Sequence, residues 1–277
     1  SESPRQPRTP NALIYNSCAF DGPLMNKSES QTATSNNSPA RLSMAAENYL
    51  LSIFRLQEQD VKVTHTILAK HLKTLPVGEG LGTSLPSVGG MIRRMVREGL
   101  LDATANKGVV LTSEGHRSAE SIVRRHRLAE RLVVDLLGLE LHLAHIEAHR
   151  LEHAISPTLE QKIVQALGNP TTCPFGHSIP GSGYSSDQPS ATLDKSEAGE
   201  QVVVHSIPED DPELLKYLVD NNLVPGQPVD VKDAATTRGV ITLQCMGVDV
   251  VFSYDVAAKI RVRPLAQHTR QLSSPGR

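Results

Sequence analysis

Residues 84–115, SLPSVGGMIRRMVREGLLDATANKGVVLTSEG, carry the signals of one helix followed by a short β-hairpin. Ser84 is a typical N-cap residue, and Pro86 lies in the first turn, where a helix tolerates proline. Apolar residues then recur at helical spacing up to Leu100, and the pattern changes to alternation on both sides of the turn at 106–108. A helix that leads into such a hairpin is typical of a winged helix-turn-helix domain.

Two further helices are predicted before this stretch. Residues 45–56, AAENYLLSIFRL, place apolar side chains at helical spacing, and residues 64–73, THTILAKHLK, begin with Thr64 as an N-cap. Glycine and proline exclude regular structure from the segment TLPVGEGLGTS that follows. We therefore expect residues 41–115 to form a winged helix-turn-helix DNA-binding domain, with double-stranded DNA as its partner.

The next region of the chain is helical. Three successive amphipathic patterns predict a helical domain at 116–183. The first predicted helix begins a few residues before this domain boundary. These patterns cover residues 113–137, 138–155 and 156–168.

The C-terminal region is predicted to be rich in β-strands. Proline, glycine and serine indicate a linker at 184–200, and alternating apolar residues around one helix indicate a small β-barrel at 201–266. Residues 1–40 and 267–277 are expected to be tails without regular structure. Met25 is interpreted as a natural start, which makes residues 1–24 an expression scar.

Composition and charge narrow the function classes. No apolar run reaches the roughly 18 residues that a membrane span requires, so we expect no membrane partner and a cytoplasmic location. Three scattered cysteines suggest neither a disulfide framework nor a CxxC metal site. The net charge of −2 is unevenly distributed, with 14 Lys and Arg against 9 Asp and Glu in residues 41–131. The predicted DNA-binding half is thus the half that suits phosphates.

A second stretch, AHIEAHRLEHAIS at 144–156, is crowded with potential metal ligands. Residues three and four apart share a helix face, so one side of this helix offers both imidazoles and carboxylates. The preceding helix repeats the pattern in HRLAE, where His126 and Glu130 are four apart. Two such helices packed antiparallel would enclose one or two ions of Mn²⁺, Fe²⁺, Zn²⁺ or Co²⁺. The expected ligands are His126, Glu130, His145, His149, Glu152 and His153.

Three other interpretations are open. A single His and Glu pair at this spacing is usually solvated or salt-bridged, although two successive pairs favour metal. A metalloenzyme fused to a DNA-binding domain would need a general base and an open metal position, and no HExxH occurs. A winged helix used only for protein contacts, with histidines that respond to pH, is the third.

The helix at 84–97 is the candidate for major-groove contact. Small residues at its start allow the backbone to approach base edges, whereas the arginines and one residue of the wing are suited to phosphates. The expected DNA-contacting residues are Ser84, Pro86, Ser87, Gly89, Gly90, Arg93, Arg94, Arg97 and Lys107.

Three motifs carry a resemblance to a known family. RRHRLAERLVVDLLGL at 124–139, AHRLEHAIS at 148–156 and NPTTCPFGHSIPG at 169–181 resemble the signatures of the diphtheria toxin repressor family. These proteins are metal-dependent transcriptional repressors that sense iron or manganese. The resemblance implies a homodimer that binds a palindromic operator when metal is bound, and an SH3-like fold for the C-terminal domain.

The resemblance also implies two metal sites. A primary site matches Asn48, His149, Glu152 and His153, and an ancillary site matches His126, Glu130 and His145 with Glu209 from the third domain. Asn48 and His149 stand where iron sensors have Met and Cys and manganese sensors have Asp and Glu. Oxygen and nitrogen in place of sulfur favour Mn²⁺ over Fe²⁺, with Zn²⁺ and Co²⁺ as alternatives. The expected function is repression of metal-uptake genes when Mn²⁺ is plentiful.

Overall fold

The computed structural model describes residues 42–76, 81–104, 108–184 and 189–265. Lys107, the predicted tails and the proposed start at Met25 lie outside these residues. No helix among the described residues has both the length and the apolar character needed to cross a bilayer.

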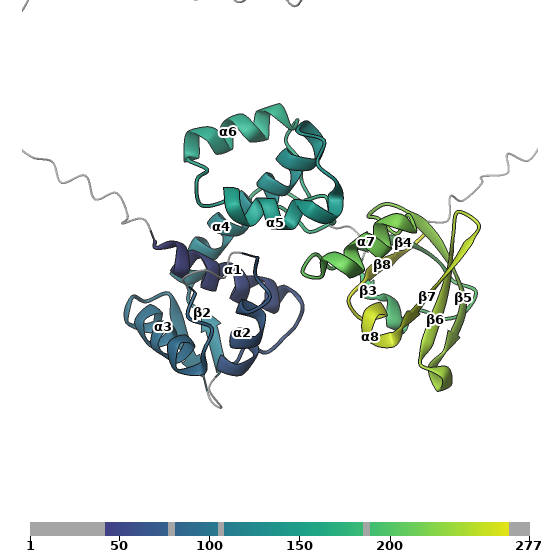
Figure 1. Ribbon diagram of the computed structural model, residues 1–277, viewed down its shortest axis with the longest axis horizontal. Helices are drawn as coiled ribbons and strands as arrows, with labels where there is room; N and C mark the ends of the chain where they lie inside the picture. Colours follow the sequence, from purple (N-terminus) through teal and green to yellow (C-terminus); the bar gives the residue numbers. More distant parts are fainter. Residues whose placement is uncertain (1–41, 77–80, 105–107, 185–188, 266–277) are drawn as a thin grey trace, which may run out of the picture. The chain divides into compact units, whose positions relative to one another are not determined.

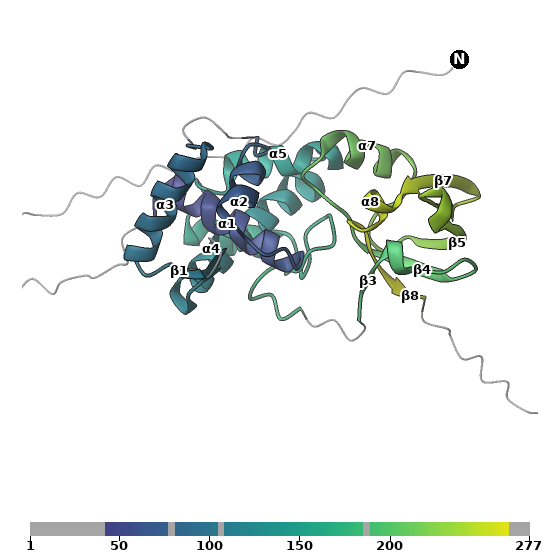
Figure 2. The ribbon, with the colours of Figure 1, turned by 90° about the horizontal axis from the view of Figure 1, so that it is seen from below.

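The N-terminal part is three helices and a hairpin, as the sequence predicts. Helices α1 (Met44–Glu58), α2 (His65–Leu72) and α3 (Leu85–Arg97) group with strands β1 (Leu101–Thr104) and β2 (Gly108–Leu111) in both views (Figures 1 and 2). The predicted N-caps are present, because Thr64 Oγ1 accepts from the Ile67 amide and Ser84 Oγ accepts from the Ser87 amide. The two strands pair antiparallel, and the core beneath them is aliphatic.

The helical region begins with α4 (Ser113–Arg131), which starts before the predicted domain boundary and packs on α1. A π-helical segment, η2 (Leu132–Leu136), prolongs it to the predicted end, and its wider turn is closed by the Leu137 amide donating to the Leu132 carbonyl. Helices α5 (Leu141–Leu151) and α6 (Pro157–Ala166) follow. Both pack on α4, so the faces that carry the predicted ligands are turned toward each other.

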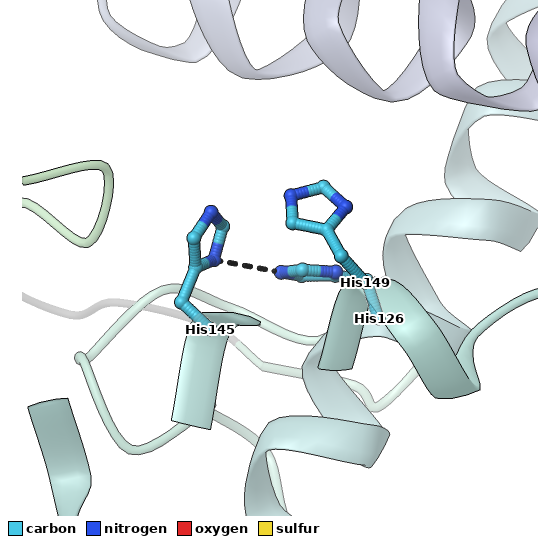
Figure 3. A group of neighbouring side chains, drawn as sticks. All are labelled: His126, His145 and His149. Atoms are coloured by element: carbon cyan, nitrogen blue, oxygen red, sulfur yellow. Dashed lines mark hydrogen bonds between the residues drawn. The ribbon is translucent and has the colours of Figure 1, made fainter. Parts of the chain in front are cut away.

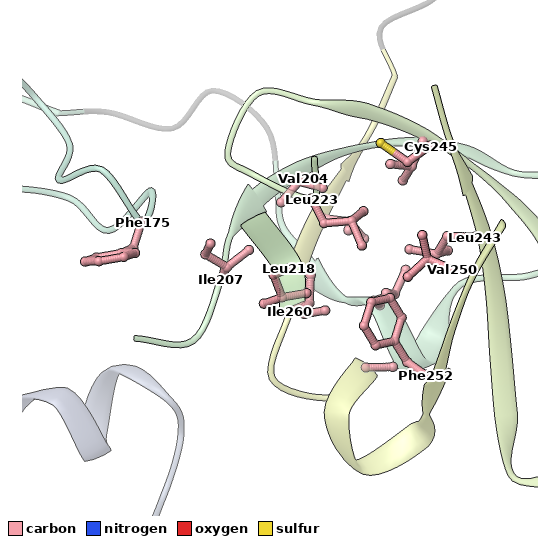
Figure 4. Packing of buried hydrophobic residues seen from close by; sticks show 14 of the residues in the cluster. Phe175, Val204, Ile207, Leu218, Leu223, Leu243, Cys245, Val250, Phe252 and Ile260 are labelled. Carbon is pink, nitrogen blue, oxygen red and sulfur yellow. The ribbon is translucent and has the colours of Figure 1, made fainter. Parts of the chain in front are cut away.

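The C-terminal part is an antiparallel sheet of six strands in the order β3-β8-β4-β5-β6-β7. Figure 4 shows the aliphatic and aromatic side chains that fill its interior. The strands are β3 (Ala191–Thr192), β4 (Gln201–Ser206), β5 (Pro228–Ala235), β6 (Val240–Cys245), β7 (Val248–Ser253) and β8 (Arg261–Pro264), joined by α7 (Pro212–Asp220), α8 (Tyr254–Ala257) and the 3₁₀ turns η3 (Leu193–Lys195) and η4 (Thr236–Arg238).

Part of the predicted linker at 184–200 belongs to this sheet. Strand β3 pairs with β8, and Leu193 of η3 is fully buried in the core. Burial of a leucine is worth about 2 kcal/mol. A two-residue strand has too short an alternation to be recognised in a segment rich in serine and proline, which is why the sequence pattern missed it.

A loop after α6 holds the sheet against the helical region. Phe175 packs in the same core as the sheet, and its carbonyl accepts from the Ile207 amide at 3.0 Å (Figure 4). Gly176, at φ +92°, leaves no room for a side chain, because a Cβ there would lie 2.0 Å from the His205 carbonyl oxygen. This close approach fixes the end of β4, from which the chain runs on to Glu209.

Candidate metal centre

Helices α4 and α5 bring six of the predicted ligands together in the interior. His126 and Glu130 come from α4, and His145 and His149 from the facing side of α5. Glu152 is the C-cap of α5, so Glu152 and His153 lie in the turn that follows the helix rather than on the helix itself. All six side chains are buried, the most exposed being His153 at 7%. Such burial of titratable groups is uncommon unless they are paired or bind a cation.

His126 lies at the centre of this group. Its Nδ1 is 2.5 Å from Glu152 Oε2, and its Nε2 is 2.9 Å from Glu130 Oε1 and 3.1 Å from His145 Nδ1. Figure 3 shows the rings of His126, His145 and His149 next to one another, with centroids 4.6 to 4.9 Å apart. One imidazole therefore borders both sets of predicted ligands.

The first of these sets, which we call cluster 1, contains His149, Glu152 and His153. Glu152 Oε1 is 3.3 Å from His149 Nδ1 and 3.2 Å from His153 Nε2. Two buried acceptors point to a further partner, because His149 Nε2 and Asn48 Oδ1 have no hydrogen-bond partner among the described residues. Unsatisfied buried acceptors are costly, and a cation is the partner that such nitrogen and oxygen atoms suit.

Helix α1 contacts cluster 1 through Glu47, the residue before the predicted ligand Asn48. Glu47 Oε2 is 2.6 Å from His153 Nδ1, and Glu47 Oε1 accepts from Arg125 at 2.7 Å. Although burial opposes it, the hydrogen bonds from His153 and Arg125 hold the pKa of Glu47 below its usual value. A carboxylate that accepts from Nδ1 of a metal-binding histidine orients its ring and leaves Nε2 as the ligating nitrogen, and Glu47 has this position relative to His153.

The second set, cluster 2, contains His126, Glu130, His145 and Glu209. These four residues can each offer one ligand atom within 4.8 Å of the others, and all four are buried. Glu209 comes from the connection between β4 and α7, as the resemblance implied for the third domain. The sequence did not reveal that Arg55 of α1 also enters this group, 2.7 Å from Glu209 Oε1 and 2.6 Å from Asp210 Oδ1.

Burial sets the protonation of both clusters. It lowers the pKa of His149 to about 3, helped by the charge of Arg55, and lowers the pKa of His145 well below its usual value for the same reasons. Burial also raises the pKa of Glu130 and of Glu209 to about 7. Neutral imidazoles are the form that binds metal, and a cation between the carboxylates would remove the penalty on their charged form.

Comparison with known proteins shows the family to which this chain belongs. The model of the iron-dependent repressor metal binding and dimerisation domain matches residues 112–181, and that of the FeoA domain matches residues 191–264. The iron-dependent repressor IdeR of Mycobacterium leprae is 34% identical over 71% of this chain and 87% of its own length. The chain belongs to the diphtheria toxin repressor family.

Two further members show the range of this family. The diphtheria toxin repressor of Corynebacterium glutamicum is 30% identical over 78% of the chain and 94% of its own length. A manganese-dependent transcriptional repressor solved in complex with manganese has a TM-score of 0.70 and 31% identity, covering 79% of this chain and all of that one. The protein is thus a metal-dependent transcriptional repressor and not an enzyme, which removes the metalloenzyme interpretation.

Helix α3 is the candidate DNA-contacting element of this family member. The predicted residues Ser84, Pro86 and Ser87 are exposed at its start, and Gly90 is half-buried while Gly89 is buried. Arg93, Arg94 and Arg97 are exposed further along, and Arg94 Nε pairs with Glu98 at 2.7 Å. Lys107 of the wing lies outside the described residues.

Proposed function

We propose that this protein represses metal-uptake genes as a homodimer that binds a palindromic operator when Mn²⁺ is bound. Support comes first from His149 of cluster 1 and Asn48 of α1, whose Nε2 and Oδ1 are buried without a hydrogen-bond partner among the described residues. The proposed primary ligands are Asn48, His149, Glu152 and His153, and the proposed ancillary ligands are His126, Glu130, His145 and Glu209.

The donor atoms favour manganese within this proposal. The eight proposed ligands offer imidazole nitrogen, carboxylate oxygen and one amide oxygen, and no sulfur. Hard oxygen donors suit Mn²⁺, whereas Met and Cys sulfur favours softer ions. Four imidazoles are also compatible with Fe²⁺, Zn²⁺ and Co²⁺, so these ions are the comparisons that a titration must include.

The route from metal to DNA runs through α1. This helix belongs to the DNA-binding domain and packs on α4, and Arg125 of α4 joins Glu47 of α1 to the carbonyl of Glu152 at 3.1 Å. A bound divalent cation would add a bridge between Asn48 and the turn after α5. An ion that binds this arrangement better than a looser one stabilises it by linkage, and with it the spacing of the two α3 helices in a dimer.

The helical domain also carries a candidate dimer surface. Leucine side chains at the end of η2 and on α5 and α6 are 37% to 69% exposed, which leaves apolar surface that association would bury. The matched family model describes this same region as a dimerisation domain. The residues of this proposed surface are Leu136, Leu137, Leu143 and Leu159.

A DNA-binding experiment tests the proposal. An operator would be selected from a random pool of double-stranded DNA with the protein in 0.1 mM Mn²⁺, in a range where roughly micromolar sites are filled. The affinity for the selected duplex would then be measured with Mn²⁺, Fe²⁺, Zn²⁺, Co²⁺ and a chelator. We expect Mn²⁺ to raise the affinity at least tenfold over the chelator and His149→Ala to remove the increase. Equal affinity with and without every metal would contradict the proposal.

A further inference from the structure

Arg55 is a buried cation at the edge of cluster 2. It lies on α1, seven residues after Asn48, and its side chain is 4% exposed. Its Nη2 forms an ion pair with Glu209 Oε1 at 2.7 Å and donates to Asp210 Oδ1 at 2.6 Å, and its Nη1 is 3.3 Å from His145 Nε2. The guanidinium thus contacts two of the four residues that form cluster 2.

The contact with His145 determines which of its nitrogens carries the proton. An arginine only donates hydrogen bonds, so His145 Nε2 must accept from it, and neutral His145 then carries its proton on Nδ1. This Nδ1 faces His126 Nε2 at 3.1 Å and Glu130 Oε1 at 3.2 Å. Nδ1 is therefore the nitrogen that points into cluster 2, and in this tautomer it has no lone pair for a metal.

The contacts continue to His126. The Nδ1 proton of His145 is donated within cluster 2, to His126 Nε2 or to Glu130 Oε1, and His126 itself lies between Glu130 Oε1 at 2.9 Å and Glu152 Oε2 at 2.5 Å. A hydrogen-bonded chain thus runs from Arg55 through His145 and His126 to Glu152. Each imidazole nitrogen of this chain has a partner without an ion, whereas His149 Nε2 of cluster 1 has none among the described residues; in cluster 2 the unpartnered atoms are the carboxylate oxygens Glu130 Oε2 and Glu209 Oε2.

We propose that Arg55 is an internal competitor for the cation of cluster 2. Its positive charge balances Glu209, its bond to Nε2 holds His145 in the tautomer that cannot ligate through Nδ1, and its proximity opposes a second positive charge. The protein accordingly binds its first ion at cluster 1 and a second ion at cluster 2 only weakly, until Arg55 leaves Glu209. This inference rests on the proposed metal sites.

Metal titration of the full chain tests the role of Arg55. Calorimetry with Mn²⁺ and with Zn²⁺ gives the number of bound ions and the affinity of each. The electron paramagnetic resonance spectrum of bound Mn²⁺ shows whether two ions lie close together. Arg55→Gln should tighten the second ion at least tenfold and leave the first ion within about threefold of its original affinity, so that most of the change stays with cluster 2. Arg55→Lys, which keeps the charge but not the fork of donors, should give a smaller increase.

Two controls separate this effect from a general loss of an ion pair. Arg124→Gln removes an arginine of α4 that pairs with Glu160 at 2.6 Å, outside both clusters, and should change neither affinity. The double variant Arg55→Gln with Glu209→Gln should lose the increase, because Glu209 is then no longer an anionic ligand.

The outcomes distinguish the inference from the proposed function. A second ion that binds no more tightly in folded Arg55→Gln and Arg55→Lys than in the original chain overturns the inference alone, provided the first ion still binds. An increase that survives in the double variant with Glu209→Gln also overturns it, since the ion would then lie elsewhere. Absence of binding of any ion to the original chain and to every variant would overturn both.

Discussion

Clusters 1 and 2 meet where His126 of cluster 2 contacts Glu152 of cluster 1, but their buried charges are compensated differently. In cluster 1, Glu47 accepts a hydrogen bond from His153 Nδ1, and His149 Nε2, like Asn48 Oδ1 on α1, has no hydrogen-bond partner among the described residues. In cluster 2, Arg55 supplies a positive charge and sets the tautomer of His145. A buried carboxylate behind a histidine prepares it for a cation, whereas a buried guanidinium in the same position takes the place of one.

Glu152 should give the largest difference between the clusters. It is fully buried and lies within 3.3 Å of His126, His149 and His153, so Glu152→Gln removes the charge that these three imidazoles share. We expect the first ion to bind at least ~100-fold more weakly, at or beyond the upper end of losses for groups that only support a ligand. Calorimetry with Mn²⁺ measures this loss, and metal-dependent DNA binding should disappear with it.

Glu147→Gln is the matched control for Glu152. Glu147 lies on α5 as well, but it is partly exposed and pairs with Arg150 at the surface. Its substitution should leave both ions unaffected. An equal loss in both variants would mean that the charge of α5, and not the position of Glu152, determines affinity.

Glu47 should produce a smaller and more selective loss. Glu47→Gln weakens the hydrogen bond that orients His153, and the loss of a partner of this kind costs about 10-fold or more in metal affinity. The first ion should weaken by about that factor, and the second ion should be unchanged. Glu58→Gln, on the same helix but paired with Arg127, is the control that should change neither. A loss at the second ion would contradict the separation of the two clusters.

The pH dependence of metal affinity should also distinguish the two clusters. Burial raises the pKa of Glu130 and Glu209 to about 7, so each carboxyl is partly protonated near neutral pH in the metal-free fold, and a bound ion must displace that proton. The second ion should gain about tenfold in affinity for each such proton between pH 6 and pH 8. His149, with its pKa near 3, is neutral throughout this range, so the first ion should change less. Titrations at three pH values would reveal equal slopes if this assignment is wrong.

The carboxyls of Glu130 and Glu209 also predict how the stability of the metal-free protein changes with pH. The pKa of a glutamate in the unfolded chain is about 4.5, whereas these two have a pKa of about 7 in the folded protein. Between these pH values the folded state therefore holds protons that the unfolded chain has already released. The contribution of the two carboxyls is complete below about pH 4.5 and is lost as the pH rises through about 7. Mn²⁺ should abolish this loss, because both carboxylates would then be neutralised by the ion.

Local sequence patterns predicted more of the fold than of the electrostatics. The caps at Thr64 and Ser84 and the facing pairs on α4 and α5 depend on residues three or four apart, which a helical pattern reveals. The roles of Glu47 and Arg55 depend on partners more than 75 residues away, such as His153 and Glu209. Only the spacing of seven residues between Asn48 and Arg55, which places both on one face of α1, could have indicated that Arg55 faces the metal region.

Substitution of the exposed arginines of α3 should have the smallest effect on DNA affinity. It tests whether the metal clusters affect DNA binding independently of the positive charge of α3. Arg97 is exposed and has no ion pair among the described residues, whereas Arg94 is paired with Glu98. Arg97→Gln should lower the slope of log affinity against log salt by about 1 and weaken DNA binding equally with and without Mn²⁺. Arg94→Gln should change the slope less, because its charge is already partly neutralised. If either substitution instead altered the ratio of affinities with and without Mn²⁺, α3 would belong to the metal-dependent coupling that we assign to cluster 1 alone.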